Sequence, residues 1–236
     1  MIMKKNEIKR INLGGSNSYL IKGSDGYILV DTGIKGAGKK LVSELKILNA
    51  KPENIRLIIL THDHYDHTQG LMEVKQITGA PVAIHEAENA LPNQEQSLKV
   101  NESSFLFRMI VKVFGSITPK QELNDIIADI KIYNEMDLNE YGVDAKLYHV
   151  PGHSPGSVCL ITADNQCVIG DTLFNMFPGT HYPIIVYNRK ILADTYKRLS
   201  ILNPAVYYPG HGKPITMEMF QKRVMNRSKY FKTGGQ

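Results

Sequence analysis

The sequence predicts an α+β fold in which two β-sheets pack face to face and helices cover their outer sides. Short apolar runs bounded by glycine-containing turns predict strands, and segments with apolar residues at three- and four-residue spacing predict helices. The two kinds of segment follow one another in two similar halves, each beginning with strands and ending with helix. Because a sheet must bury its apolar face, two such halves are expected to pack through their sheets.

The first half is predicted to contain a strand meander at 11–30, helix at 39–48, strand at 55–60, helix at 70–77, strand at 81–84 and a helical turn at 85–90. In the meander, apolar runs alternate with turns rich in glycine and asparagine. The run at 55–60 is continuously apolar, which is typical of a strand buried on both faces.

An insertion is predicted at about 92–129. It begins with a polar stretch and contains one amphipathic helix with the apolar segment 105–114. That segment has more apolar area than a solvated helix needs. Packing on the sheet is the favoured interpretation, and a lid over an acyl chain or a homodimer contact are the alternatives.

The second half is predicted to contain strands at 130–133, 145–150, 157–162 and 167–169, a helix at 189–202, a strand at 205–208 and a helix at 217–229. With 236 residues, the chain is near the upper limit for one core. We expect a single domain that spans 1–236.

Composition and charge narrow the classes of partner. The formal net charge is +5, but the lysines and arginines are scattered and form no basic run of the kind that nucleic-acid binding favours. Nothing in the sequence has the length and apolarity of a membrane span or of a secretory signal. Cys159 and Cys167 lie inside apolar runs, which favours buried core residues over a disulfide framework. We expect a cytoplasmic protein with a small-molecule substrate and no nucleic-acid partner.

Histidines and aspartates are concentrated directly after the predicted strand at 55–60. The segment 61–67 contains His62, Asp63, His64, Asp66 and His67. Imidazole nitrogen and carboxylate oxygen are ligands that zinc prefers. Alternate residues of an extended loop point to the same side, so His62 and His64 are expected on one side and the later pair on another. One segment could thus serve two adjacent metal ions.

Three further loops are predicted to carry residues of the same kind, each after an apolar run. They contain His153, Asp171 and His211. Glycines beside the two histidines let the backbone turn sharply and bring a ligand close to an ion. Five of the eight histidines thus fall in three short loops, which favours a metal site over chance.

These segments resemble the motifs of the metallo-β-lactamase superfamily and follow one another in that family's order. They are Val30-Asp31-Thr32-Gly33, the His-x-His-x-Asp-His core at 62–67, Gly152-His153, Gly170-Asp171-Thr172 and Gly210-His211-Gly212. The resemblance implies a four-layer αββα sandwich, the metallo-β-lactamase fold, with its site at the edge between two sheets.

The resemblance also implies a role for each site residue. Its ligands are His62, His64 and His153 for one ion, Asp66, His67 and His211 for the other, and Asp171 as the bridge. In this pattern Asp63 lies beside the site without binding metal. Asp31 is expected to orient a ligand histidine from the second shell.

Such a site predicts hydrolysis by a metal-bridging hydroxide. Two cations about 3.5–4 Å apart share a water and lower its pKa from about 15.7 towards ~7. Asp66 is the candidate catalytic residue that orients or deprotonates this water. Two zinc ions per chain are expected, although iron and manganese accept the same ligands.

Within the superfamily, the sequence favours cleavage of an ester, a thioester or a lactone. The segment 170–174 is similar to that of glyoxalase II-like thioesterases and of lactonases. An iron-dependent redox or sensor protein on the same fold and a phosphodiesterase remain alternatives. A β-lactamase is disfavoured, because those enzymes usually lack the bridging aspartate that Asp171 provides and carry an export signal.

Three histidines lie outside the motifs. His85 and His149 are expected to be structural residues with satisfied hydrogen bonds. His181, together with Tyr182, follows the Asp171 segment closely. These two residues are candidates for substrate binding on the basis of proximity alone.

Overall fold

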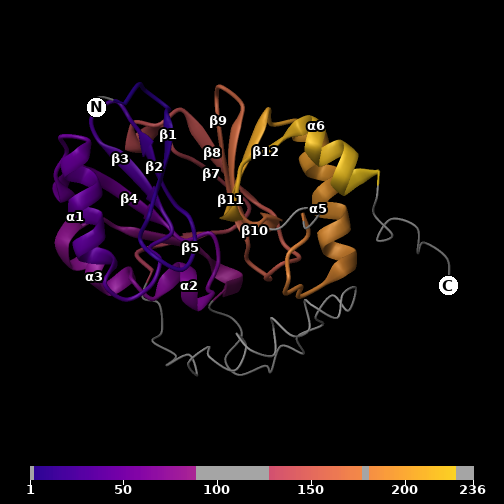
Figure 1. Cartoon of the computed structure of the whole chain (residues 1–236), viewed down its shortest axis with the longest axis horizontal. Coiled ribbons are helices and arrows are strands. Elements are labelled where there is room, and N and C mark those ends of the chain that lie inside the picture. The colour runs from indigo at the N-terminus through magenta and orange to yellow at the C-terminus, as the bar shows by residue number, and fades with distance from the viewer. Residues whose placement is uncertain (1–2, 89–127, 177–180, 227–236) are drawn as a thin grey trace.

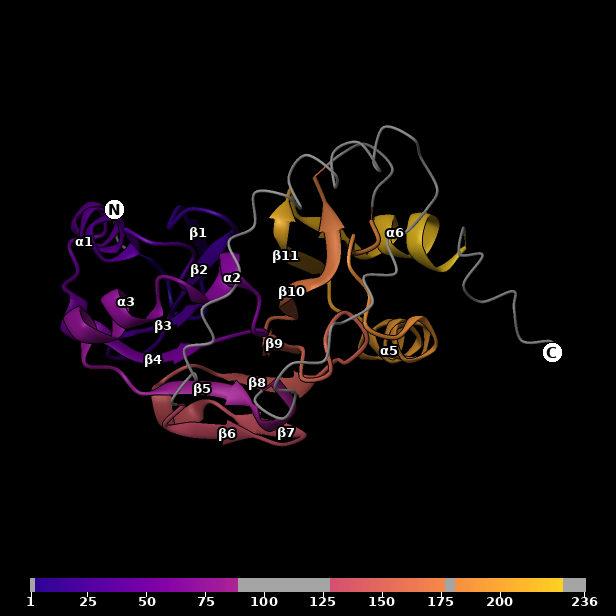
Figure 2. The ribbon, with the colours of Figure 1, turned by 90° about the horizontal axis from the view of Figure 1, so that it is seen from below.

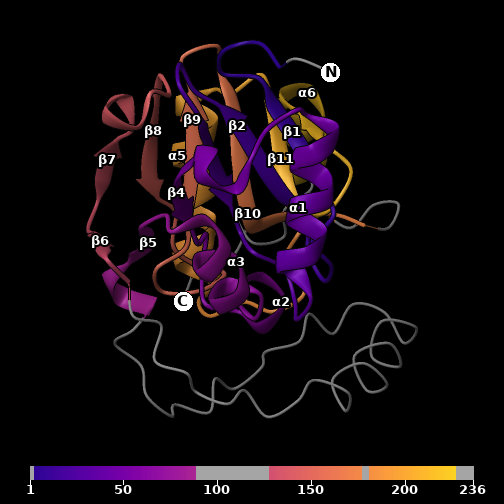
Figure 3. The same ribbon diagram turned by 90° about the vertical axis from the view of Figure 1, so that its left-hand side faces the viewer.

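The computed structural model describes residues 3–88, 128–176 and 181–226. Within these ranges two mixed sheets of six strands each pack against one another (Figure 1). Helices α1 (Ala37–Ile47) and α3 (Leu71–Thr78) cover the outer face of the first sheet (Figure 3). Helices α5 (Arg189–Leu202) and α6 (Met217–Phe220) lie outside the second sheet (Figure 1). The predicted four-layer αββα sandwich is therefore confirmed.

The first sheet has the order β1-β2-β3-β4-β5-β6. Its strands are β1 (Ile8–Ile11), β2 (Ser18–Lys22), β3 (Tyr27–Val30), β4 (Ile55–Ile59), β5 (Val82–His85) and β6 (Ile130–Ile132). β1 to β3 form an antiparallel meander that begins at Ile8, three residues before the predicted range 11–30, whereas β3 to β6 run parallel. Because parallel strands end at the same edge, the segments after β3 and β4 lie next to each other.

The second sheet has the order β12-β11-β10-β9-β8-β7. Its strands are β7 (Glu135–Asp137), β8 (Ala145–His149), β9 (Val158–Thr162), β10 (Gln166–Asn175), β11 (Val206–Gly212) and β12 (Ile215–Thr216). β10 and β11 are parallel, and the other neighbouring pairs are antiparallel. The sequence did not predict β7 and β12, because each is short and half polar.

β10 and β11 correct the expectation that Asp171 and His211 lie in loops. The pairing of β10 with β11 continues past Gly170 to Phe174, which is opposite His211, with two shifts of register on the way. Such irregularities bend a strand and redirect its side chains. The two glycine-containing segments are therefore strand, and their ladder fixes where their ligands point.

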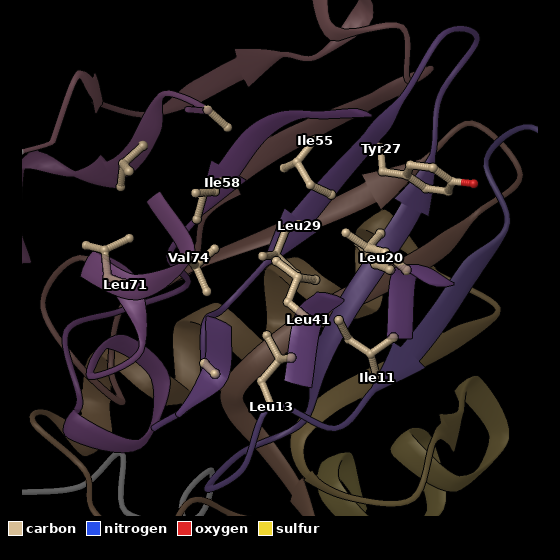
Figure 4. Close-up of a cluster of buried hydrophobic side chains, with 14 of the residues drawn as sticks. Ile11, Leu13, Leu20, Tyr27, Leu29, Leu41, Ile55, Ile58, Leu71 and Val74 are labelled. Carbon is tan, nitrogen blue, oxygen red and sulfur yellow. The ribbon is translucent and has the colours of Figure 1, made fainter. Parts of the chain in front are cut away.

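Apolar side chains fill three layers. The layer between the sheets contains Ile59 of β4 and Leu147 of β8, both almost fully buried. Figure 4 shows the outer layer of the first sheet, in which Leu41 of α1 and Val74 of α3 lie near Leu29 of β3. Burying a side chain of this size stabilises the fold by about 1.5–3 kcal/mol. These layers hold the sheet edges that carry the polar motifs.

Local signals explain where the helices begin and end. The side chain of Asn188 accepts hydrogen bonds from the backbone N–H groups of Lys190 and Ile191, so it caps α5. Asn203 ends α5 in the left-handed conformation, which asparagine tolerates. The helix predicted over 189–202 is thereby confirmed to the residue.

The remaining short elements are α2 (Tyr65–Thr68), the 3₁₀ turns Pro52–Asn54, Glu86–Glu88 and Asn139–Tyr141, and the π-helical turn Gln221–Met225 that continues α6. Most of the predicted insertion at 92–129, including the segment 105–114, lies outside the described residues. Cys159 and Cys167 are buried free thiols, as predicted. Among the described helices, none combines the length and the apolar composition that crossing a membrane requires.

Candidate metal centre

The seven predicted ligands come from both sheets and meet at one edge of the sandwich. After β4 the chain continues through His62 to His64, and His64 directly precedes the single turn of α2. Asp66 and His67 lie on α2, which Figure 2 shows facing β10 and β11 across the gap between the halves. Asp66 and His67 thus point in a different direction from His62 and His64 because they lie on a helical turn. The sequence had predicted an extended loop for this segment.

Within the described ranges, two groups of side chains have ligand atoms within 4.8 Å of one another. The first cluster consists of His62, His64, His153 and Asp171. The second cluster consists of Asp66, His67 and His211. Apart from Asp171, which the resemblance assigns to both ions, each group contains the residues that the resemblance assigns to one ion.

Asp171 faces both clusters. Its Oδ1 lies 3.3 Å from Nε2 of His67, and its Oδ2 lies 3.5 Å from Nε2 of His211. Its Oδ2 is also 3.8 Å from Nε2 of His153 and 4.0 Å from Nε2 of His62. One carboxylate therefore lies between the two clusters.

The histidines of the first cluster are held neutral. Burial lowers the pKa of His62, and the neighbouring imidazoles of His67 and His64 lower it further. Burial also lowers the pKa of His64, and burial together with His64 lowers the pKa of His153 to about 4. A neutral imidazole has one nitrogen lone pair available for a metal ion.

Hydrogen bonds behind two of these rings decide which nitrogen carries that lone pair. Nδ1 of His153 is 2.8 Å from the carbonyl oxygen of Ile185, so Nδ1 carries the proton. Thr61 Oγ1 donates to the Asp31 carboxylate and therefore accepts from Nδ1 of His62. Both rings then direct an unprotonated Nε2 towards Nδ1 of His64, at 3.0 and 2.9 Å.

This convergence fits a cation better than a proton. Two lone pairs face one nitrogen of His64, and a single proton can satisfy only one of them. A metal ion accepts a lone pair from each ring, and neutral imidazole is a ligand that zinc prefers. In addition, His67 Nε2 and Asp171 Oδ1 are buried and have no hydrogen-bond partner among the described residues, although they face each other. Buried polar atoms of this kind are rare and indicate a bound ion or a functional role.

The second cluster has the opposite electrostatic character. Burial disfavours protonation of His67, but the carboxylates of Asp171 and Asp31 outweigh it and raise its pKa well above the usual value. His211 shows the same balance, and Asp171 and Asp66 raise its pKa to about 9. The carboxylates thus create a strongly negative pocket that attracts a positive charge.

Asp31 lies behind His67, where the sequence placed a second-shell residue. Its Oδ2 accepts a hydrogen bond from Nδ1 of His67 at 2.8 Å, and its Oδ1 accepts one from the backbone N–H of Thr61 at 2.8 Å. Asp31 has a φ of 60°, an unusual value for a residue other than glycine. This backbone conformation, at the end of β3, points the carboxylate at the neighbouring strand end.

Asp63 lies beside the first cluster and belongs to neither group of ligands. Burial and the nearby carboxylate of Glu88 raise the pKa of Asp63 to about 7. Its backbone N–H donates to Oε2 of Glu88 at 2.8 Å. Its carboxylate accepts a weak hydrogen bond from Thr68 at 3.4 Å.

Gly210 allows β11 to approach the centre. A Cβ atom at this position would overlap Oδ1 of Asp171 and would lie 2.7 Å from Cε1 of His67. Contacts this short do not occur in folded proteins, so any larger residue would displace the Asp171 carboxylate. The requirement for glycine before His211 is therefore steric.

A loop between β1 and β2 supports the second cluster, and sequence reasoning did not identify it. Ser16 Oγ donates to the carbonyl oxygen of Asp66 at 2.8 Å. Asn17 Nδ2 donates to the carbonyl oxygens of Pro209 and Gly212, at 2.9 and 3.0 Å. The sequence shows these residues only as a turn, because their partners on β11 are far away along the chain.

The other predicted residues occupy different surroundings. His85 and His149 stack on each other with ring centroids 3.8 Å apart, and each donates or accepts hydrogen bonds with backbone groups. His181 is fully buried, and its Nε2 lies 3.2 Å from Nη1 of Arg223. The hydroxyl of Tyr182 donates to a carbonyl oxygen of the π-helical turn. Neither His181 nor Tyr182 joins a cluster, and their role in substrate binding stays a prediction.

An αββα sandwich with a two-part histidine and aspartate centre at the shared edge of its sheets defines a class of metal-binding proteins. Comparison with known families agrees, since the Metallo-beta-lactamase superfamily matches residues 11–211. The chain belongs to the metallo-β-lactamase superfamily.

Relatives and solved structures extend this match. The chain is 30% identical over 201 residues to "Probable metallo-hydrolase MJ0888" of Methanocaldococcus jannaschii, covering 84% of this chain and 88% of the relative. The crystal structure of BLEG-1 B3 metallo-beta-lactamase superposes with a TM-score of 0.68 at 21% identity, covering 94% and 100% of the two chains. TTHA1623 in a di-iron-bound form superposes with a TM-score of 0.62 at 23% identity, covering 88% and 93%. The relative's name supports a metal-dependent hydrolase, and the two structures support the fold.

Proposed function

We propose that this protein is a dinuclear metal-dependent hydrolase that cleaves an ester, a thioester or a lactone. The observation that carries the proposal is the position of Asp171 between two clusters of neutral or carboxylate-paired histidines. We assign His62, His64 and His153 to one ion, Asp66, His67 and His211 to the other, and Asp171 to both. When bound, two metal ions supply an activated water and a Lewis acid for the substrate carbonyl.

The chain's own residues prepare the centre for this chemistry. Asp171 is 5% exposed, so water has little access to the carboxylate between the clusters. Asp66 is 34% exposed and accepts a hydrogen bond from Nε2 of His211 at 2.9 Å. Because it is the most open carboxylate of the set, Asp66 is the group that can orient a water or take its proton.

Zinc is the proposed metal because the donor set contains only nitrogen and oxygen atoms and neutral imidazoles dominate the first cluster. Iron is the alternative to test, since a protein of the same fold is described in a di-iron-bound form. The two free buried cysteines support a reducing compartment, and we propose a cytoplasmic location.

The substrate class rests on the similarity of the segment 170–174 to that of thioesterases and lactonases. A substrate panel tests it, with one aryl ester, one acyl thioester, one lactone, one phosphodiester and one cephalosporin. We expect turnover of at least one of the first three compounds. Turnover of the phosphodiester or the cephalosporin alone would replace the proposed substrate class.

The metal centre is tested separately. Protein purified without added metal is expected to contain about two zinc ions per chain, as in other two-metal sites. His64→Ala is expected to lose metal and activity together, because His64 is the point where the first cluster converges. His85→Ala, a histidine outside both clusters, is the matched control and should keep both. Iron together with turnover of O₂ or a persulfide, or an active His64→Ala variant, would overturn the assignment.

A further inference from the structure

Glu88 connects two loops that carry ligands of the first cluster. It ends the 3₁₀ turn Glu86–Glu88 after β5, outside every sequence motif. Its Oε2 accepts a hydrogen bond from the backbone N–H of Asp63 at 2.8 Å, directly between His62 and His64. Its Oε1 accepts hydrogen bonds from Ser154 Oγ and from the backbone N–H of Gly156, both at 2.6 Å. The first loop follows a strand of the first sheet, and the second follows a strand of the second sheet.

The chemistry of these bonds requires a carboxylate. All three groups that face Glu88 donate, and only an ionised carboxylate offers acceptors on both oxygens. Hydrogen bonds to a charged acceptor are also roughly twice as strong as neutral ones. A glutamine at this position would direct an N–H donor at one of these three donors. The hydrogen bond to at least one of the two loops would therefore be lost.

Glu88 also orders the turn that carries His153. Ser154 and Ser157 are both buried, and their hydroxyl oxygens lie 2.6 Å apart. Since Ser154 Oγ donates to Glu88, the proton between the two serines must come from Ser157. Ser157 Oγ in turn accepts from the backbone N–H of Ser154 at 3.1 Å. Glu88 therefore fixes the direction of the hydrogen bond between the two serine hydroxyls.

Gly156 provides an independent observation of the same fit. A Cβ atom at position 156 would lie 2.8 Å from Cγ and from Oε1 of Glu88. Gly156 has no positive φ, so its backbone conformation does not require glycine. The space beside its Cα is needed for the Glu88 side chain.

We propose that Glu88 is a positioning residue that sets the distance between His153 and the pair His62 and His64, and so determines the metal affinity of the first cluster. This inference rests on the proposed metal centre. His153 and His64 approach to 3.0 Å across the two sheets. Glu88 holds the backbone behind each of them and does not touch the ligand atoms.

Zinc titration against a chromophoric chelator tests the proposal, because it resolves two binding steps per chain. Glu88→Gln and Glu88→Ala are expected to weaken one step by about 10–100-fold and to leave the other unchanged, as loss of outer-shell partners does in other metal sites. Ser154→Ala removes one of three hydrogen bonds and should have a smaller effect on the same step. Gly156→Ala keeps the carboxylate but displaces it, and should reproduce the loss.

Glu86→Gln is the matched control, since Glu86 is an exposed glutamate of the same turn. It should bind zinc as the wild type does. A second readout separates positioning from general stability: the absorption spectrum of bound Co²⁺ should change in Glu88→Gln, because this spectrum reports ligand geometry.

The outcomes separate the two proposals. If the wild type binds zinc in two steps and Glu88→Gln matches it in affinity and Co²⁺ spectrum, this inference is wrong and the metal centre stands. A Glu88→Gln variant that loses only thermal stability also contradicts the inference. If the wild type itself binds no metal, the proposed function fails. Should Glu88→Ala not fold, Ser154→Ala and Gly156→Ala provide the same comparison.

Discussion

At the residue scale, the acceptor behind each histidine ring determines how the ring meets the centre. Asp31, Thr61 and the carbonyl oxygen of Ile185 hold Nδ1 protons, which leaves Nε2 of His62, His67 and His153 facing inwards. A ring without such a partner can rotate or change tautomer, and its basicity falls. The centre therefore depends on residues that never reach a ligand atom.

Asp31→Asn tests this dependence. The amide has one acceptor oxygen, which cannot serve both His67 Nδ1 and the N–H and hydroxyl of Thr61. We expect zinc affinity to fall by about 10–100-fold in the binding step that Glu88 variants leave unchanged, and the loss extends to the other step because Thr61 also orients His62. Chelator titration measures both steps. Asp25→Asn, an exposed aspartate paired with Arg56, is the control; equal affinities for the two variants would contradict the expectation.

His85 gives a residue-scale prediction about pH. Its Nε2 donates to the carbonyl oxygen of Tyr133, and its Nδ1 accepts from the N–H of Ala87 at 3.2 Å. Burial and the stacked ring of His149 lower the pKa of His85, and they outweigh Glu86 and Glu88, which act in the opposite direction. The folded protein thus keeps His85 neutral when an exposed histidine is already charged.

The sign of the effect follows from that shift. As pH falls through about 6.5, the unfolded chain binds the proton first, so the free energy of unfolding decreases until pH reaches the lower pKa of the folded state. Above about pH 7.5 His85 is neutral in both states, so it has no such effect on the free energy of unfolding. His85→Gln keeps a donor for Tyr133 but cannot titrate. Between about pH 7.5 and pH 5.5, the urea midpoint should therefore fall less in the variant than in the wild type. Equal decreases in both proteins would rule out the neutral state.

At the element scale, sequence predicted what depends on nearby residues. The apolar period of α5 lies within its own segment, so both ends of the helix were predicted. The run that forms β4 leads directly into the histidine-rich segment, which is why ligands there could be named from sequence. β10 was predicted too short, because its last residues pair with β11, and that strand is far away along the chain.

The supporting residues show why part of the site escaped prediction. Asn17 and Glu88 are ordinary polar residues in turns, and nothing in their neighbours distinguishes them. Their partners lie in other motifs and come close only after both sheets have packed. A ligand histidine can be recognised from its own chemistry, whereas a positioning residue is defined by three-dimensional contacts.

The loop between β1 and β2 can be tested as an element. Asn17→Ala removes two hydrogen bonds to carbonyl oxygens of β11. The carbonyl of Pro209 still accepts a hydrogen bond from the hydroxyl of Tyr19. Among the described residues, no other side chain donates to the carbonyl of Gly212. We expect the free energy of unfolding to decrease by about 1–2 kcal/mol. Urea unfolding measures it. The control is Asn12→Ala, because the Asn12 side chain accepts a hydrogen bond from the nearby N–H of Gly14. It should change the free energy of unfolding by less than about 0.5 kcal/mol; a larger loss there would contradict the assignment.

At the scale of the whole molecule, the centre joins two sheets that also meet through the apolar layer between them and through hydrogen bonds such as those of Asn17 and Glu88. The first cluster takes His62 from the first sheet and His153 from the second, and Asp171 reaches from β10 to α2. Metal bound there holds both halves together in the folded state only. Ligand binding to the folded state raises its stability by mass action.

Removal of metal should therefore lower the melting temperature of the whole protein. At a free zinc concentration about 1,000-fold above its Kd, binding contributes about 4 kcal/mol. For a chain of this size the loss corresponds to a decrease in Tm of about 8–16 °C. Scanning calorimetry with and without a chelator measures it. His64→Ala should show a much smaller difference, and an unchanged Tm in the wild type would mean that the two halves do not share bound metal.

The two hydrogen bonds from Asn17 to β11 span 192 and 195 residues of sequence. During synthesis, the first sheet's ligands therefore emerge long before the strand that carries His211. The first cluster can assemble once Asp171 has left the ribosome, but the second must wait for β11 and for the loop that receives it. Contacts between distant parts of a chain form late in folding. We expect the newborn protein to acquire its metal ions in a fixed order, the first cluster before the second.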